Sequence, residues 1–388
     1  MITRLELKNF TAFSELAIDF SPKINVIIGE NGNGKTQLLK SAYALCAGGA
    51  LQQHKPGAAG NELEQTLARK LVRVLMPLDE KLGNMRRSGA RGNAQLKAAF
   101  VLGEEIDLTF NGTAEVAIVN ANAAYANYRA EPIFVPTKEV LSLVRGMADA
   151  NHDQRTVELI FDDGYLDLAQ MMLREGVEDP ESKVNLDPRF DSIVPMLANL
   201  IGGRYQLENG EFCFQSGTYI EKLGKSSSET KAPQTFQKAT TRFVPAKSAM
   251  LSSGMTAEGF RKVGVLQRLL TNGTLNPGVS GPLLWDEPES NLNPKLMRQL
   301  VEILLELSRN GQQVILATHD YVLLKWFDLL MDKGQDDHVR FHTLYRDGDS
   351  GNVQVDSVDD YRALKANAIS DAFNDLTIAH AQSRLKGA

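Results

Sequence analysis

The sequence predicts an α/β fold in which a largely parallel sheet is covered by helices on both faces. Short apolar runs typical of buried strands, at residues 24–28, 282–285 and 314–317, alternate with segments of helical periodicity. A glycine-rich turn joins the first of these strands directly to a helix. Because parallel strands are connected by crossover helices that pack on the sheet, this alternation indicates such an architecture.

Apolar patterning and turn residues place the other elements. Residues 2–20 alternate around the turn NFTAF and predict a hairpin, and the Asn-Gly pairs at 111–112 and 209–210 predict tight turns between paired strands. Further strands are expected within residues 97–120 and 204–215, at 133–135 and at 340–345. Helices are expected at residues 36–46, 62–75, 138–147, 156–174, 188–201, 256–271, 294–307, 321–331 and over most of 359–385. The Gly-, Arg- and Ser-rich residues 83–93 predict a mobile basic loop, and the polar residues 224–235 predict disorder.

Composition describes a globular chain of 388 residues. Hydrophobic residues make up 43%, and 42 basic against 48 acidic side chains give a net charge of −6, so no overall field attracts nucleic acid. Cys46 and Cys213 lie far apart and outside any CxxC pair, which predicts buried thiols in a reducing cytosol. The N-terminus lacks the apolar core of a signal peptide, and no apolar run of about 18 residues occurs, so we expect a cytoplasmic protein without a membrane segment.

The glycine-rich turn, GENGNGKT, fits the pattern GxxxxGK[ST] that cradles phosphates. Its glycines let backbone amides converge on phosphate oxygens, and the following helix directs its positive end at the same anion. Lys35 is expected to reach the β- and γ-phosphates of ATP, and the Thr36 hydroxyl to hold Mg²⁺. The alternative is a strand-to-helix turn that binds nothing. The residues expected to contact nucleotide are Gly29, Glu30, Asn31, Gly32, Asn33, Gly34, Lys35, Thr36 and Gln37.

Two further segments place polar side chains directly after buried strands. In LLWDEPESNLNP, Asp286 can bind the same Mg²⁺ as Thr36, and Glu287 can polarise a water that attacks the γ-phosphate. In VILATHD, His319 can donate a hydrogen bond to the γ-phosphate. Acidic turns are also common as plain helix starts, and a histidine is often a structural residue. The order of the three segments favours the catalytic interpretation, with Lys35, Glu287 and His319 as catalytic residues.

These motifs resemble those of ABC-type ATPases of the RecF, SMC and OLD group, and of the AAA-family ATPases that serve as subunits of bacterial anti-phage defence systems. GENGNGKT corresponds to the Walker A motif, LLWDEP to Walker B, the segment from Ser290 to Asn293 to the D-loop, and His319 to the H-loop. The opening LELKNFTAF and IDFSPKINVIIG also resemble the family's first strands. The resemblance is clear over residues 1–50 and 240–325.

The resemblance implies a P-loop NTPase head with a mixed, mostly parallel sheet and an inserted, mainly helical lobe. We expect residues 1–136 and 246–388 to form the head and residues 137–245 to form the lobe. In this family two heads sandwich two nucleotides, each completed by the other head's signature motif. A homodimer is therefore expected, with Ser290 and Asn293 near the nucleotide.

The signature motif departs from the family pattern. Residues 251–255, LSSGM, are one variant; residues 256–259, TAEG, are another, which would place Thr256, Glu258 and Gly259 against the partner's ATP. We favour TAEG because a helix follows it at once and can direct its N-terminus at the γ-phosphate. Simple loop and N-cap roles are the alternatives. No Q-loop glutamine is evident; Lys138 or Glu139 occupies the expected place, where a helix start is equally compatible.

Three uses of such an ATPase compete. The first is a subunit of a bacterial anti-phage defence or toxin–antitoxin system, with a separate effector protein and nucleic acid as a trigger that binds only weakly to the chain alone. The second is a RecF-like DNA-repair clamp, in which Arg86, Arg87 and Arg91 would line a DNA path. The third is the nucleotide-binding subunit of a transporter. The unusual signature and the inserted lobe argue against the third, and we favour the first.

Overall fold

The computed structural model describes residues 1–51, 61–148, 153–175, 192–222, 240–364 and 368–386, and the predicted disorder at 224–235 lies outside them. The chain divides into two compact units. The head comprises Met1–Lys138, Ala150–Leu168 and Asn276–Ala388, and the lobe comprises Glu139–Asp149 and Ala169–Leu275. None of the helices in the described part of the chain is long and apolar enough to cross a membrane.

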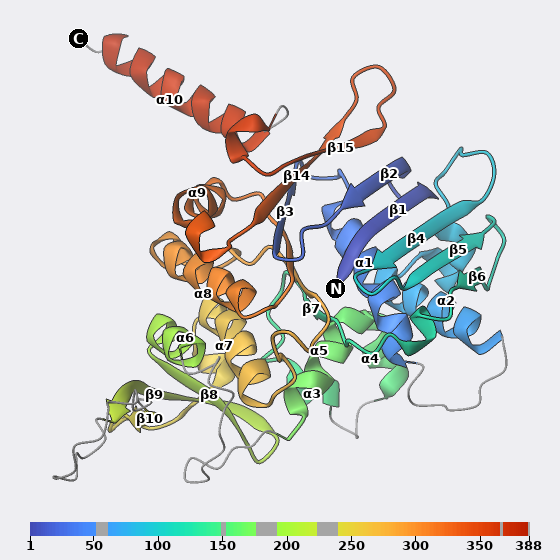
Figure 1. The fold of residues 1–388 in the computed structure, drawn as a ribbon. Helices are drawn as coiled ribbons and strands as arrows, with labels where there is room; N and C mark the ends of the chain where they lie inside the picture. Colours follow the sequence, from blue (N-terminus) through green and yellow to red (C-terminus); the bar gives the residue numbers. More distant parts are fainter. Residues whose placement is uncertain (52–60, 149–152, 176–191, 223–239, 365–367, 387–388) are drawn as a thin grey trace, which may run out of the picture. The chain divides into compact units, whose positions relative to one another are not determined.

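The head is built on a six-stranded sheet in which five strands are parallel, as the sequence predicts (Figure 1). The exception, β15, pairs antiparallel with β14 at the edge, and the sequence analysis did not find it. In spatial order the strands are β15 (Val353–Val358), β14 (Val339–Arg346), β3 (Ile24–Gly29), β13 (Val314–Ala317), β12 (Leu283–Asp286) and β7 (Ile133–Val135). The carboxyl ends of β3, β12 and β13 therefore meet at one edge of the sheet.

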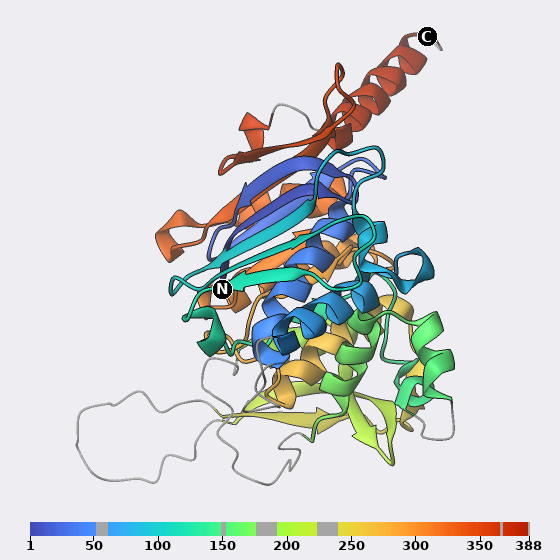
Figure 2. The ribbon, with the colours of Figure 1, turned by 90° about the vertical axis from the view of Figure 1, so that its right-hand side faces the viewer.

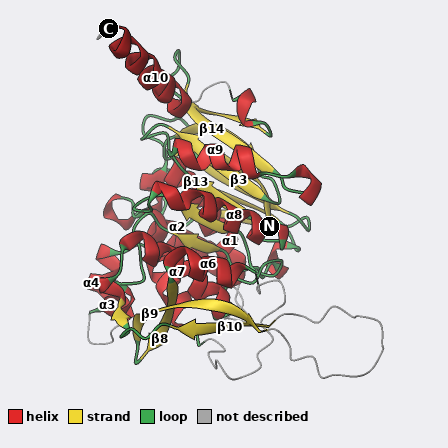
Figure 3. Cartoon of the chain, turned by 90° about the vertical axis from the view of Figure 1, so that its left-hand side faces the viewer, coloured by secondary structure: helices red, strands yellow, loops and turns green. Residues whose placement is uncertain are grey.

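Helices cover this sheet on both faces. α8 (Met297–Arg309) and α9 (Tyr321–Leu330) lie over one face, while α1 (Lys35–Leu51) lies over the other (Figures 1 and 3). α1 is apolar nearly all round and is buried along most of its length, as expected for a helix between two sheets. α10 (Ala368–Lys386) contacts α9 through stacked Tyr321 and Phe373 rings.

A second, antiparallel sheet packs over α1 and α2 (Asn61–Leu75) (Figure 2). The predicted N-terminal hairpin is confirmed, but it belongs to this sheet and not to that of the P-loop strand. The strands in spatial order are β2 (Phe13–Asp19), β1 (Ile2–Phe10), β4 (Ala94–Phe100), β5 (Glu105–Phe110) and β6 (Ile118–Ala121). Their inner side chains and those of α1 form one apolar core.

The tight turn predicted at Asn111 and Gly112 is wrong. β5 ends at Phe110 and β6 begins at Ile118, so a longer loop joins the paired strands. This loop is pressed against Gly83, where a Cβ atom would lie 2.5 Å from the Gly112 carbonyl carbon, and the Gly83 amide donates to the Ala114 carbonyl at 2.9 Å. The tertiary contact overrides the local turn preference.

The basic loop at residues 83–93 is attached to the β1–β2 turn. Phe10 forms a β-bridge with Arg86, and the Arg87 amide donates to the Asn9 carbonyl at 2.8 Å. The Arg86 guanidinium donates to the carbonyls of Ala90 and Gly92 in its own loop. Arg86 is thus used to hold the loop together.

The helix predicted at 156–174 is divided into α4 (Gln154–Ile160) and α5 (Asp163–Leu173). The break occurs because Asp162 turns its carboxylate to accept the Gly164 amide at 2.7 Å and to pair with Lys40 at 2.7 Å. The helix predicted at 138–147 is reduced to α3 (Val144–Ala148), and that at 188–201 is described as α6 (Ile193–Ile201).

The lobe combines helices with a small antiparallel sheet (Figure 3). α6 packs on α7 (Glu258–Thr271), and β8 (Gly203–Glu208) pairs with β9 (Glu211–Lys222), which also pairs with β10 (Thr240–Pro245) and β11 (Leu251–Ser252). The tight turn predicted at Asn209 and Gly210 is confirmed, with φ of 50° and 80°.

The compact units differ from the boundaries that we predicted at 136 and 246. Residues 246–275 join the lobe because α7 packs on β8: the Gln267 side chain accepts the Tyr205 amide at 2.9 Å, and Gly264 leaves no room for a Cβ beside the Tyr205 ring. Residues 150–168 join the head because Asp162 and Asp163 pair with Lys40 and with Arg73.

Candidate nucleotide site

The turn between β3 and α1 has the backbone that a phosphate cradle requires. Gly29 has φ of 151°, and a Cβ there would lie 2.4 Å from the Leu344 carbonyl oxygen. Gly34 has φ of 87°, and a Cβ there would lie 2.7 Å from the Phe13 ring. Both positions therefore need glycine. α1 begins at Lys35, so its N-terminal amides face the turn.

The Lys35 ammonium lies within the turn itself. It donates hydrogen bonds to the carbonyls of Gly29 at 2.6 Å and Glu30 at 3.1 Å. Burial lowers the pKa of Lys35, while the carboxylates of Glu287 and Asp286 act in the opposite direction. The cation is thus held at the place where a phosphate group would meet it.

The other residues of the turn divide into exposed and anchored ones. Glu30, Asn31 and Gly32 are exposed and available to a ligand. The side-chain amide of Asn33 donates to the Leu344 carbonyl at 3.0 Å, and the side-chain oxygen of Gln37 accepts the backbone amide of Ala12 at 3.3 Å. The side chains of Asn33 and Gln37 therefore fix the turn against neighbouring strands.

Thr36 and Asp286 meet as predicted. The Thr36 hydroxyl donates to Asp286 Oδ2 at 2.8 Å, and the Thr137 hydroxyl donates to the same oxygen at 3.0 Å. Burial raises the pKa of Asp286, and these two hydrogen bonds oppose that rise. Thr137 was not predicted. Of the two residues considered for this place beside a plain helix start, Lys138 is exposed, and the Glu139 carboxylate pairs with Arg261 at 3.0 Å in the lobe.

These oxygen donors fit Mg²⁺. Mg²⁺ is usually bound by one or two protein oxygens, with phosphates and water completing its octahedral shell. Thr36 and Asp286 supply such a pair next to the cradle. Among the residues that the structure describes, no group of three His, Cys, Asp or Glu side chains could hold a metal ion.

Glu287 and His319 lie together at the ends of β12 and β13. The nearest atoms, His319 Nδ1 and Glu287 Oε1, are 3.3 Å apart. Glu287 has φ of 50°, in the left-handed region, and its amide donates to the Ala317 carbonyl at 2.9 Å. This backbone lets Asp286 and Glu287 leave the strand in different directions, each toward its own partner.

Glu289 is a further carboxylate at this edge that sequence analysis did not assign. It is 7% exposed, and its Oε1 accepts the Thr318 hydroxyl at 2.7 Å and the His319 amide at 3.3 Å. Burial raises the pKa of Glu289. The only sequence signal for it was a third acidic residue within the segment DEPES.

The two D-loop residues have different surroundings. The Ser290 hydroxyl donates to the Thr137 carbonyl at 3.2 Å, which places it beside the Thr36–Asp286 pair. Asn293 accepts the Lys295 amide at 3.0 Å and caps the short helical turn before α8.

The signature candidates lie in the lobe, whereas the residues above lie in the head. The Thr256 hydroxyl is engaged with the Tyr205 hydroxyl at 2.6 Å and with the Ser253 carbonyl at 2.7 Å. α7 begins at Glu258 and Gly259, and its N-cap, Ala257, makes no side-chain cap. The N-cap alternative for Thr256 is therefore wrong, because Ala257 is the N-cap, and the TAEG hypothesis stays a prediction.

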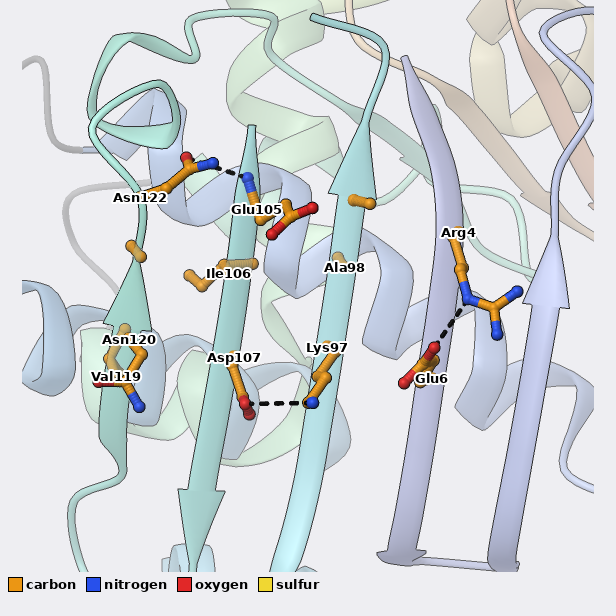
Figure 4. Close-up of a pocket in the computed structure, with 12 residues that line it drawn as sticks. Arg4, Glu6, Lys97, Ala98, Glu105, Ile106, Asp107, Val119, Asn120 and Asn122 are labelled. Atoms are coloured by element: carbon orange, nitrogen blue, oxygen red, sulfur yellow. Dashed lines mark hydrogen bonds and ion pairs between the residues drawn. The ribbon is translucent and has the colours of Figure 1, made fainter. Parts of the chain in front are cut away.

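A pocket elsewhere in the head shows no comparable chemistry. It lies on the outer face of the antiparallel sheet, over β1, β4, β5 and β6 (Figure 4). Four of its charged side chains are paired with one another, Arg4 with Glu6 at 2.7 Å and Lys97 with Asp107 at 3.6 Å. We therefore place the candidate site at the P-loop.

Known proteins resemble separate parts of the chain. A family model described as "AAA domain, putative AbiEii toxin, Type IV TA system" matches residues 252–325, and one described as "AAA domain" matches residues 4–70. The DNA replication and repair protein RecF of Idiomarina loihiensis is 48% identical over 56 residues, which are 14% of this chain and 15% of RecF. RecF of Ligilactobacillus salivarius is 33% identical over 86 residues, 22% of this chain and 21% of RecF. The chain thus matches about a fifth or less of the length of these relatives.

The fold resembles that of an SMC head. A crystal structure of the SMC head bound to the C-winged helix domain of ScpA aligns with a TM-score of 0.50 and 12% identity. The alignment covers 94% of this chain and 99% of that one. At this identity the likeness concerns the fold alone, and it agrees with the predicted P-loop NTPase head.

Proposed function

We propose that this chain, an ABC-type ATPase of the RecF/SMC group, binds ATP with Mg²⁺ and transfers the γ-phosphoryl group to water. The observation that carries the proposal is the meeting of four side chains at one sheet edge beside the cradle: Thr36, Asp286, Glu287 and His319. Sequence segments 250 residues apart supply the first two, which are in direct contact.

Each side chain has a role that follows from its surroundings. The Lys35 ammonium, which donates to the Gly29 carbonyl of the turn, neutralises phosphate charge when it exchanges this carbonyl for phosphate oxygens. Thr36 and Asp286 would hold Mg²⁺, which supplies charge stabilisation to the transferring group. Glu287 orients and polarises the attacking water. His319, beside Glu287, donates a hydrogen bond toward the γ-phosphate.

The test is steady-state phosphate release by the purified chain, with Mg²⁺ and with EDTA. Glu287→Gln should retain ATP binding and lose at least about a hundredfold in turnover, because it removes the water-polarising carboxylate but leaves Asp286 in place. Glu302→Gln, a more exposed carboxylate on α8 paired with Arg298, is the matched control and should hydrolyse ATP normally. Wild-type turnover in Glu287→Gln would contradict the assignment of Glu287 as the residue that polarises water.

We further propose that two heads sandwich two ATP molecules and that the start of α7 in one chain completes the site of the other. The absence of a side-chain cap at Ala257 supports this, because free helix amides attract an anion. ATP binding would then join the heads, and hydrolysis would release them.

For the biological role we propose a bacterial defence or toxin–antitoxin system with a separate effector protein. The description of the family model that matches residues 252–325, which names a type IV toxin–antitoxin system, supports this role. A RecF-like repair clamp is the second candidate, supported by the short segments of 33–48% identity to RecF. The bonds that Arg86 makes within its own loop reduce the cationic surface available for that clamp.

A further inference from the structure

Glu289 is a buried carboxylate that the proposed mechanism leaves unused. Its Oε1 accepts two hydrogen bonds, from the hydroxyl of Thr318 and from the amide of His319. Its Oε2 is buried without a partner among the described residues. Both bonds go to one segment, and that segment carries His319.

The segment is also held from two other directions. The Thr318 amide donates to the Ile27 carbonyl of β3 at 3.0 Å, and the Thr318 hydroxyl accepts the Asp320 amide at 3.0 Å. Asp320 in turn caps α9 by accepting the Leu323 amide at 2.7 Å. Glu289 is therefore a side-chain link between this segment and the turn that bears Glu287, next to the backbone bond from the Glu287 amide to the Ala317 carbonyl.

The His319 ring is half-exposed and lies near two carboxylates. Its side chain is 52% exposed, and Nδ1 lies 3.3 Å from Glu287 Oε1 and 3.9 Å from Glu289 Oε1. A half-exposed ring has few neighbours to restrict it, so its place beside Glu287 follows from where its backbone is fixed.

We propose that Glu289 is a positioning residue that anchors the peptide joining Thr318 to His319 and so keeps the His319 ring beside Glu287. The inference deepens the proposed ATPase function and rests on it for the kinetic consequence. The geometry of His319, however, can be measured without ATP hydrolysis.

The kinetic test compares substitutions at Glu289. Glu289→Ala removes the acceptor and should lower kcat at least about tenfold, with the Kd for ATP unchanged within about twofold. Glu289→Gln keeps an acceptor oxygen and should restore most of the turnover. The control is Asp337→Ala, which removes another buried carboxylate outside the site. Asp337 accepts two hydrogen bonds from Arg309, of 2.7 Å and 2.9 Å, and its loss should leave kcat unchanged. Normal kcat in Glu289→Ala, or equal loss in Glu289→Gln, would overturn the inference.

A double-mutant cycle separates positioning from general destabilisation. If Glu289 acts through His319, Glu289→Ala combined with His319→Ala should be no slower than His319→Ala alone. Effects that multiply would show that Glu289 acts independently of His319, which contradicts the proposal.

An NMR measurement keeps the inference separate from the ATPase assignment. The chain has six histidines, so the imidazole signal of His319 can be identified by its loss in His319→Gln. Glu289→Ala should shift or broaden that signal, and Asp337→Ala should not. If wild type fails to hydrolyse ATP, the proposed function fails while this result still decides the positioning. An unchanged His319 signal in Glu289→Ala would refute it.

Discussion

Asp286 has two hydroxyl donors on a single oxygen, and only one of them was expected. Thr36 belongs to the P-loop, whereas Thr137 follows β7 at the sheet edge, 149 residues before Asp286. Both fix the carboxylate while it is largely buried. Residues that orient a metal ligand typically influence affinity for the metal.

Thr137→Val therefore tests the orientation of Asp286. We expect the Mg²⁺ concentration for half-maximal ATPase activity to rise at least about tenfold, with nucleotide binding in EDTA unchanged. Titration of Mg²⁺ at fixed ATP measures this. Thr113→Val is the matched control, because the Thr113 hydroxyl bonds to Asn111 in an exposed loop. An unchanged Mg²⁺ requirement in Thr137→Val would mean that Thr36 alone orients the carboxylate.

His342 makes stability depend on pH. It is fully buried between Asn25 and Ser357, and burial, followed by the charge of Arg340, lowers its pKa from 6.5 to about 3. As pH falls, His342 takes up a proton in the unfolded chain before it does so in the folded chain. The contribution of neutral His342 to the free energy of unfolding is therefore complete above pH 6.5 and is lost toward pH 3. Urea unfolding measures the free energy of unfolding at each pH. Between pH 6.5 and about pH 4.5, this free energy should fall by about 2 kcal/mol less in His342→Gln than in wild type. Equal losses would contradict this.

In the proposed sandwich, the start of α7 decides how a second chain would complete the site. If TAEG is the signature, Gly259→Asp places a carboxylate where the partner's γ-phosphate would lie, a repulsion of several kcal/mol in a site shielded from water. Lys35→Ala disables the P-loop half of the same composite site. Each should be inactive alone, while a mixture should regain part of the ATPase activity because one interface of the mixed dimer is wild type.

Two controls accompany this mixture. Gly254→Asp tests LSSGM, since Gly254 is exposed with open space around it. Inactive Gly254→Asp beside normal Gly259→Asp would identify LSSGM as the signature. Light scattering of Glu287→Gln with saturating ATP should show a dimer, and a protein that stays monomeric would contradict the sandwich.

The charge of the molecule bears on the choice between defence subunit and repair clamp. Net charge is −6, and Arg86 is bonded within its own loop. We expect the isolated protein to bind DNA weakly, with a shallow dependence on salt because few phosphates are neutralised. Fluorescence anisotropy at several salt concentrations measures this. Tight binding at about 200 mM salt would favour the repair clamp.

Local patterns were enough for the P-loop and for the residues that follow strands. The β3–turn–α1 unit is contiguous, and Asp286, Glu287 and His319 each come at or just after the end of an apolar run, so their meeting at one edge follows from a parallel sheet. The fold class was predicted for the same reason, since alternating strands and helices allow few other arrangements.

What local patterns could not supply were contacts between distant segments. Glu289 and Thr318 are 29 residues apart, and nothing in either segment indicates that the Glu289 carboxylate would accept a hydrogen bond from the Thr318 hydroxyl. The Asn111 and Gly112 turn was overridden by the approach of Gly83, and α7 joined the lobe through its contact with Tyr205. A strand or turn preference is a property of a few adjacent residues, whereas a buried hydrogen bond or a close glycine contact exists only once the chain has packed.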